Sequence, residues 1–294
     1  MGDFEEKIGL ELESIRGSGL WRELRCIESV QGSQIYHNGK KLINFSSNDY
    51  LGLAGHHTLT EAAKHAIDRF GVGSGASRLV CGSLEVHHEL EEALARWLKA
   101  EAALVFSSGF AAAQGVISSI VGSEDVVVID KKVHASTVDA VKLSGAKLRV
   151  FKHNDLSSLE KILKWADKRN SRVLTIAESV YSMDGDSPVI EDLVDLKERY
   201  GSWLMLDEAH ALGCYGESGG GLALKSNLSE KIEIRLGTLG KSIGVAGGFI
   251  CGSKKLVDLL VNKARSFIFS TAPSPIASAA ALAGVKLVQS EEGD

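Results

Sequence analysis

Short apolar runs and amphipathic stretches alternate along most of this chain. Apolar residues that recur every three to four positions predict helices over Leu59–Phe70, Leu90–Leu98, Leu156–Ala166 and Ala277–Val288. The pattern Ser157-x-x-Glu160 is typical of a helix start. Between the helices lie short continuous apolar runs, which predict strands over Ala103–Phe106, Val126–Ile129, Val173–Ala177, Trp203–Leu206 and Phe249–Cys251.

Strands without polar alternation are buried on both faces, which indicates a mostly parallel sheet covered by helices on both sides. We therefore predict an α/β fold. The first 45 residues are expected to form a separate segment, with a helix and a short hairpin near Gln34–Ile43. Residues 46–276 are expected to form one large domain, and residues 277–294 to begin a long connecting helix.

Composition and charge narrow the function classes. The 294 residues are 44% hydrophobic and 24% charged with a net charge of −5, as in ordinary globular proteins. No basic stretch indicates nucleic-acid binding, and no apolar run is long enough to span a bilayer. The acidic segment Met1–Lys7 does not resemble a secretory signal, so we expect a cytoplasmic enzyme.

The spacing of the cysteines and of the glycines argues against a cysteine-based metal site and against a P-loop for ATP. The four cysteines are far apart in the sequence and form no C-x-x-C pair, so we predict no metal site and no disulfide framework. Gly240-Lys241-Ser242 resembles part of a P-loop, but Arg235 stands where that motif requires its first glycine. ATP binding is therefore not expected.

Polar residues follow the predicted strands, at the sheet edge where ligands of α/β proteins bind. Asp207 and His210 follow one strand, although a capping aspartate beside a surface histidine is an alternative interpretation. The other strand ends and the loops near them carry a potential helix N-terminus at Gly109, together with His134, Ser182, Thr238 and Lys241.

This set of residue types matches the needs of pyridoxal 5′-phosphate (PLP). The aldehyde of PLP requires a lysine, its pyridine nitrogen a carboxylate, its ring a stacking partner, and its phosphate a helix N-terminus with hydroxyl groups. The lysine must also lose its proton near neutral pH, which burial favours.

Longer motifs then carry a family resemblance. In order along the chain they are Asn44–Leu53, Gly73–Arg78, Ser179–Gly185, Asp207–His210 and Thr238–Lys241. Together they resemble the α-oxoamine synthases, which are fold-type I PLP transferases. Asn44–Leu53, Gly73–Arg78 and the run from Phe106 to Ala112 are most similar to the members that make 8-amino-7-oxononanoate for biotin synthesis. Ala113 departs from the family, which usually has an asparagine at that position.

The resemblance implies a role for each matched residue. Lys241 is expected to form the Schiff base with PLP and to remove the Cα proton, and Asp207 to pair with the pyridine nitrogen. His134 is expected to stack on the ring, and Ser182 and His210 to bond its hydroxyl group. Gly109, Phe110 and Thr238 are expected to hold the cofactor and its phosphate, with Thr271 supplied by the neighbouring subunit of a homodimer. Arg22 and Asn48 are expected to line the substrate entrance.

The implied reaction is a decarboxylative condensation of L-alanine with pimeloyl-CoA or a pimeloyl carrier protein. It yields 8-amino-7-oxononanoate, CO2 and the free thiol carrier. Two alternatives to this reaction stay open. One is a sister synthase that uses glycine or serine. The other is an inactive fragment that binds the cofactor, because relatives carry a further small domain beyond the position of residue 294.

Overall fold

The computed structural model describes residues 2–168, 172–291 and 293, which fall into two compact units, Met1–Phe45 and Ser46–Asp294. In the first unit, α1 (Gly2–Gly17) precedes an antiparallel hairpin of β1 (Gln34–His37) and β2 (Lys40–Ile43). Asn38 and Gly39 at its tip both have positive φ, which is the backbone of a tight two-residue hairpin turn. The helix and the hairpin predicted for this segment are present.

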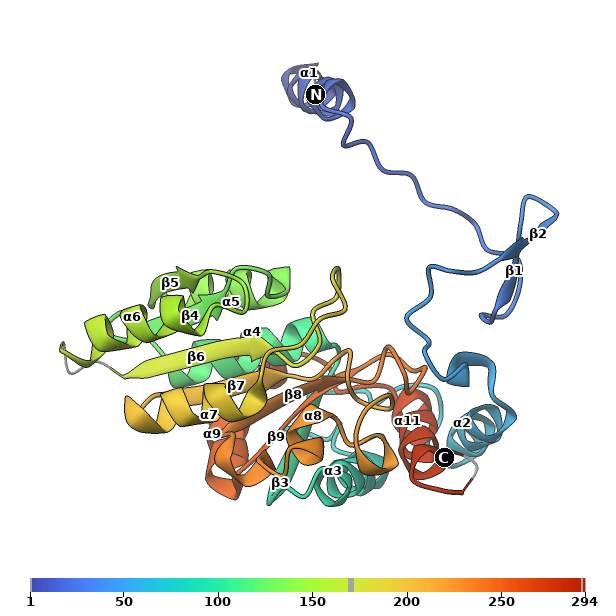
Figure 1. Ribbon diagram of the computed structural model, residues 1–294. Coiled ribbons are helices and arrows are strands. Elements are labelled where there is room, and N and C mark those ends of the chain that lie inside the picture. The colour runs from blue at the N-terminus through green and yellow to red at the C-terminus, as the bar shows by residue number, and fades with distance from the viewer. Residues whose placement is uncertain (1, 169–171, 292, 294) are drawn as a thin grey trace. The chain divides into compact units, whose positions relative to one another are not determined.

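The second unit contains a seven-stranded sheet in the order β3-β9-β8-β7-β6-β4-β5 (Figure 1). The strands are β3 (Ala102–Phe106), β4 (Val126–Asp130), β5 (Lys147–Phe151), β6 (Val173–Glu178), β7 (Trp203–Asp207), β8 (Ile234–Thr238) and β9 (Gly248–Gly252). Only β9 runs against its two neighbours. The predicted mostly parallel sheet is confirmed, with β5 and β8 added to the predicted strands.

Helices cover both faces of this sheet (Figure 1). They are α2 (His57–Phe70), α3 (Glu85–Trp97), α4 (Gly109–Ile120), α5 (Ala135–Ser144), α6 (Leu156–Asp167), α7 (Ile190–Arg199), α8 (Leu222–Lys225), α9 (Lys254–Lys263), α10 (Arg265–Ile268) and α11 (Pro275–Val288). The capping role predicted for Ser157 at the start of α6 is wrong. Asp155 caps this helix instead, because its carboxylate accepts the Ser158 N–H at 2.9 Å.

Successive residues of each central strand point to opposite faces and join different cores. In β4, Val127 and Ile129 pack with residues of α4 and α5, whereas Val126 and Val128 pack with residues of α6 and α7. A third core joins α3 and α11 beneath β3 and β9. This burial on both sides explains why the strand sequences show no polar alternation.

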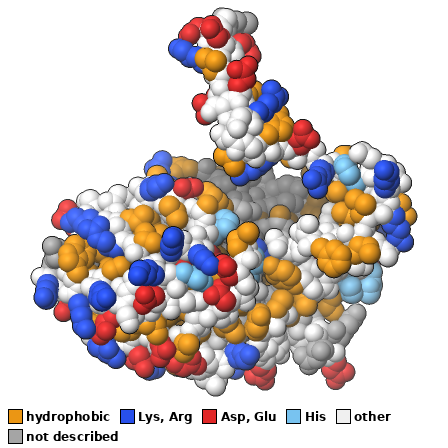
Figure 2. Space-filling model, turned by 45° about the horizontal axis from the view of Figure 1, so that its top comes forward, with side chains coloured by type: hydrophobic (Ala, Val, Ile, Leu, Met, Phe, Trp, Pro, Cys, Tyr) orange, Lys and Arg blue, Asp and Glu red, His pale blue; other side chains and the backbone are white. Residues whose placement is uncertain are grey.

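Parallel pairing brings the carboxyl ends of β5, β4, β6, β7 and β8 to one edge of the sheet. Acidic and basic side chains are intermixed on the molecular face that Figure 2 shows, with hydrophobic side chains between them. Within the described residues, none of the helices combines the length and hydropathy needed to cross a membrane.

Candidate active site

Asp207 ends β7 and is buried at the carboxyl edge of the sheet. Its Oδ1 accepts the Ala209 N–H at 2.9 Å, and it forms no ion pair with any described residue. Burial raises the pKa of this carboxyl, and Ala209, Lys241 and His134 oppose that shift. A buried carboxylate without a cation is costly, so Asp207 is poised for a positively charged partner.

Lys241 follows β8, and its Nζ lies 2.7 Å from Nε2 of His210. Burial lowers the pKa of the Lys241 ammonium, while the charges of Asp207 and Glu178 act in the opposite direction. Burial and the nearby positive charges of Lys241 and His134 lower the pKa of His210 to about 4. His210 is therefore neutral at neutral pH, and its Nε2 accepts a hydrogen from Lys241.

This contact continues into a chain of hydrogen bonds that was not predicted. His210 Nδ1 lies 2.7 Å from Oη of Tyr50, and Tyr50 in turn donates to Oδ1 of Asn48 at 3.2 Å. With Nε2 of the neutral ring as acceptor, Nδ1 carries the hydrogen and donates it to Tyr50. Asn48 is thus joined to Lys241 through Tyr50 and His210. Tyr50 lies in the Asn44–Leu53 motif, which offered the only sequence signal for it.

The ends of β4 and β6 meet at Glu178, which sequence reasoning did not assign to the site. The backbone N–H of His134 donates to Oε1 of Glu178 at 2.5 Å, and the N–H of Ser182 also donates to this carboxyl. Burial and the charge of Asp207 raise the pKa of Glu178 to about 8. The position of Glu178 at a strand end was the signal that could have identified it. The side chains of His134 and Ser182 are exposed.

The N-terminus of α4 lies beside β8 and β9. Ser108 caps the helix, with its Oγ accepting the Ala111 N–H at 3.1 Å. A Cβ added to Gly109 would lie 3.5 Å from Cβ of Thr238, so this helix start and Thr238 are adjacent. Thr238 Oγ1 donates to the Gly247 carbonyl at 3.0 Å. Together the structure places a helix N-terminus and a hydroxyl group side by side, as an anion requires.

For three predicted residues, no described contact bears on the expected role. Thr271 is exposed and pairs with Ser77 in an isolated bridge, beside the Gly73–Arg78 run. Arg22 is exposed within the separate Met1–Phe45 unit. Their roles stay predictions, as does that of Phe110, which is exposed in the first turn of α4.

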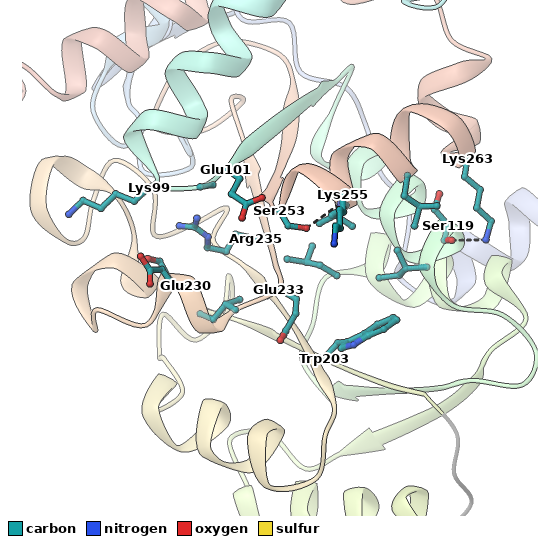
Figure 3. A pocket seen from close by; sticks show the side chains of 18 of the residues that line it. Lys99, Glu101, Ser119, Trp203, Glu230, Glu233, Arg235, Ser253, Lys255 and Lys263 are labelled. Atoms are coloured by element: carbon teal, nitrogen blue, oxygen red, sulfur yellow. Dashed lines mark hydrogen bonds between the residues drawn. The ribbon is translucent and has the colours of Figure 1, made fainter.

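A groove of about 930 Å³ lies at the opposite edge of the sheet, where β7 and β8 begin (Figure 3). Two of the cations that line it stabilise the fold, because Lys263 donates to the Ser119 carbonyl at 2.8 Å and Arg235 to the Leu98 carbonyl at 2.6 Å. None of the residues predicted for the site is among the described residues that line it. The groove is therefore separate from the candidate active site.

Comparison with known proteins gives consistent matches. Residues 40–294 match the family model for aminotransferase class I and II. The 8-amino-7-oxononanoate synthase of Geobacter sulfurreducens is 47% identical over 96% of this chain and 72% of its own length. The 8-amino-7-oxononanoate synthase 1 of Bacillus subtilis is 40% identical over 97% of this chain and 73% of its own length.

Solved structures agree with the fold. A serine palmitoyltransferase from Sphingomonas wittichii has a TM-score of 0.89 at 29% identity, over 96% of this chain and 71% of that one. The 8-amino-7-oxononanoate synthase of Francisella tularensis has a TM-score of 0.74 at 30% identity, over 84% of this chain and 69% of that one. The predicted family is confirmed: the chain belongs to the class I and II aminotransferases and, among them, to the α-oxoamine synthases.

Proposed function

We propose that this chain condenses L-alanine with a pimeloyl thioester to form 8-amino-7-oxononanoate and CO2, as a PLP-dependent enzyme of biotin synthesis. Identities of 40–47% to synthases of this name support the reaction and the cofactor predicted from the motifs. The observation that carries the assignment to these residues is the contact of Lys241 with neutral His210, beside the unpaired buried Asp207.

The chemistry of these side chains matches the groups of PLP. The buried carboxylate of Asp207 lacks a cation, and a protonated pyridine nitrogen would supply one. The N-terminus of α4 offers N–H groups that suit a phosphate, and the adjacent Thr238 hydroxyl would turn from the Gly247 carbonyl to donate to it. Lys241 has an amine whose pKa is lowered by burial, as covalent attachment to an aldehyde requires.

Bound PLP supplies an aldehyde for the amino group of alanine and a ring that withdraws electrons from its Cα. Lys241 Nζ is the base that removes the Cα proton, and His210 orients this amine. Asp207 would keep a proton on the pyridine nitrogen, and His134 would contact the ring. Ser182 and His210 are candidates to bond the ring hydroxyl.

The remaining assignments are part of the same proposal. Gly109, Phe110 and Thr238 would hold the phosphate, with Thr271 contributed by the partner subunit of a homodimer. Asn48 and Arg22 would meet the substrates, and Tyr50 would position Asn48 through their 3.2 Å hydrogen bond. The acyl carrier is CoA or a carrier protein, and the expected cytoplasmic location stays a prediction.

The test combines a label with product analysis. After incubation with PLP, borohydride reduction should fix the cofactor on the peptide that contains Lys241. With L-alanine and pimeloyl-CoA, mass spectrometry should detect 8-amino-7-oxononanoate. Lys241→Ala should abolish both signals, whereas Lys255→Ala, at an exposed lysine in the groove of Figure 3, should leave both unchanged.

The alternatives give different results. Faster turnover with glycine or serine than with alanine would assign the chain to a sister reaction. A label on Lys241 without turnover of any of the three amino acids would indicate a cofactor-binding fragment. A label on a different lysine would contradict the assignment of Lys241.

A further inference from the structure

His153 lies just beyond β5 and joins two carboxylates at the edge of the sheet that carries the candidate site. Its Nδ1 lies 2.9 Å from Oδ1 of Asp130, and its Nε2 lies 2.8 Å from Oδ2 of Asp186. Asp130 is fully buried, and the side chain of His153 is only 17% exposed. We name this arrangement of His153, Asp130 and Asp186 the His153 bridge.

The surrounding contacts determine the charge of the bridge. Oδ1 of Asp130 also accepts the Lys132 N–H at 2.8 Å, and Oδ2 accepts the Asn154 N–H at 2.9 Å. Both oxygens of Asp130 are therefore acceptors, as in an ionised carboxylate. Oδ2 of Asp186 likewise accepts the Asn154 side-chain amide at 2.9 Å. Two carboxylate acceptors on one ring require a hydrogen on each ring nitrogen, so His153 is an imidazolium.

The bridge joins the two segments that present predicted site residues. Asp130 ends β4, and His134 follows in the same turn. Asp186 belongs to the loop after β6, in which Ser182 lies, and its carbonyl accepts the Tyr181 N–H at 2.9 Å. β5, β4 and β6 are neighbours in the sheet, which brings these segments together (Figure 1).

Other contacts make the two segments one structural unit. Lys132 pairs with Asp184 at 2.7 Å, and Glu178 accepts the His134 N–H at 2.5 Å. The ring of Tyr181 meets the ring of His153 edge-on, with centroids 4.5 Å apart. The titratable and charged groups that face His153 are thus Asp130 from β4, Lys132 from the next turn, and Tyr181, Asp184 and Asp186 from the loop after β6.

We propose that His153, as an imidazolium, is a positioning residue for the reaction, because it fixes the turn that presents His134 against the loop that presents Ser182. This role rests on the function proposed above. Loss of the proton from His153 turns one donor into a lone pair that faces a carboxylate, so the bridge opens at that contact. The turn and the loop then lose one of the contacts that hold them together, so their relative position is fixed less tightly, and catalysis weakens although no group that touches a substrate has changed.

A metal site made of His153, Asp184 and Asp186 is the alternative use of these residues, since their ligand atoms lie within 4.8 Å of one another. Both ring nitrogens of His153 already contact carboxylate oxygens, and Asp184 pairs with Lys132. The contacts of the described residues therefore favour the hydrogen-bonded bridge.

The direction of the pH effect follows from the charges. Burial lowers the pKa of the His153 imidazole, but the hydrogen bonds and charges of Asp130 and Asp186 outweigh it, so the net shift is upward. The bridge is therefore complete below the ordinary histidine pKa of about 6.5 and is lost as the pH rises through the higher folded value.

The test compares His153→Gln with the wild type and with His65→Gln, which alters an exposed histidine on α2. Hydrogen exchange should show that the amides of Tyr181 and Gly185 are protected in the wild type. This protection should fall as the pH rises above the pKa of His153. His153→Gln should lose the protection at every pH, and its kcat should fall about 10- to 100-fold with little change in KM. His65→Gln should match the wild type.

Asp186→Asn is the second variant, because it removes a charge at a half-exposed position and keeps an oxygen acceptor. It should move the alkaline loss of protection and of kcat to lower pH. Protection and kcat that match the wild type in His153→Gln, or a pH dependence that Asp186→Asn does not move, would overturn the proposal. A wild type that forms no product would instead refute the proposed function, while the exchange data would still test the bridge.

Discussion

At the residue scale, the protonation of Glu178 is a consequence of where β6 ends. Burial and the charge of Asp207 raise its pKa from an ordinary value of 4.5 to about 8. A carboxyl whose pKa is raised by folding stabilises the folded protein most at pH values where it is protonated in both the folded and the unfolded protein. Its contribution is complete below pH 4.5 and is lost as the pH rises through about 8.

We therefore expect the free energy of unfolding of the PLP-free protein to fall between these pH values because of Glu178. Glu178→Gln imitates the protonated carboxyl and keeps an oxygen for the His134 N–H, so it should remove this fall. The slope that disappears is at most about 1.4 kcal/mol per pH unit. Urea unfolding of both proteins from pH 5 to 8.5 measures the difference, and parallel curves would show that Glu178 does not titrate in this range.

The sequence predicted which residue types would gather, but not how they would bond. Asp207, His210 and Lys241 were identified from strand ends and motifs, and the structure places His210 and Lys241 in contact although they are 31 residues apart. The link from His210 to Tyr50 spans 160 residues. No local pattern encodes a contact of that length, which is why Tyr50 was not assigned to the site.

At the scale of elements, Gly248 determines how closely β9 approaches α4. A Cβ at this position would lie 2.3 Å from the Gly109 backbone nitrogen and 2.5 Å from its Cα. Backbone atoms cannot rotate away from such a clash. Gly248→Ala should therefore push the helix N-terminus from the strand, cost about 1–3 kcal/mol of stability and weaken PLP binding.

Gly122→Ala is the matched control, since a Cβ there meets no atom within 4 Å. Urea unfolding gives the stability of both variants, and titration of the visible absorbance with PLP gives their cofactor affinity. A PLP affinity of Gly248→Ala equal to that of the wild type would show that the start of α4 does not bind the phosphate.

The strands that were missed show the limit of apolar runs as a signal. β5 has the sequence Lys-Leu-Arg-Val-Phe and lies at the sheet edge, where four of its five side chains are not fully buried. β8 lies inside the sheet but contains Arg235, which is buried and donates to the Leu98 carbonyl. Both strands depend on tertiary partners, so a pattern based on hydrophobicity alone does not detect them.

At the scale of the whole unit, one buried ion pair connects distant parts of the chain. Arg78 donates through both terminal nitrogens to Glu91 on α3, at 2.9 Å each, and Glu91 also accepts the Val105 N–H at 3.0 Å. The run that ends at Arg78 bonds the segment around Thr271, because the Ala272 N–H donates to the Ala76 carbonyl at 3.0 Å. The pair therefore anchors the loop on which the position of Thr271 depends.

Removal of one partner should cost more stability than removal of both. Glu91→Leu leaves Arg78 buried without its carboxylate, so the free energy of unfolding should fall by about 3–5 kcal/mol. Arg78→Met combined with Glu91→Leu also deprives Val105 of its acceptor, which alone costs about 1–3 kcal/mol, but it leaves no unpaired charge. Urea unfolding should thus find the double variant more stable than Glu91→Leu. Both variants lack the Val105 hydrogen bond. The difference between their free energies of unfolding therefore measures the cost of leaving the Arg78 charge buried without a partner. Equal stabilities would show that water reaches Arg78 when Glu91 is lost.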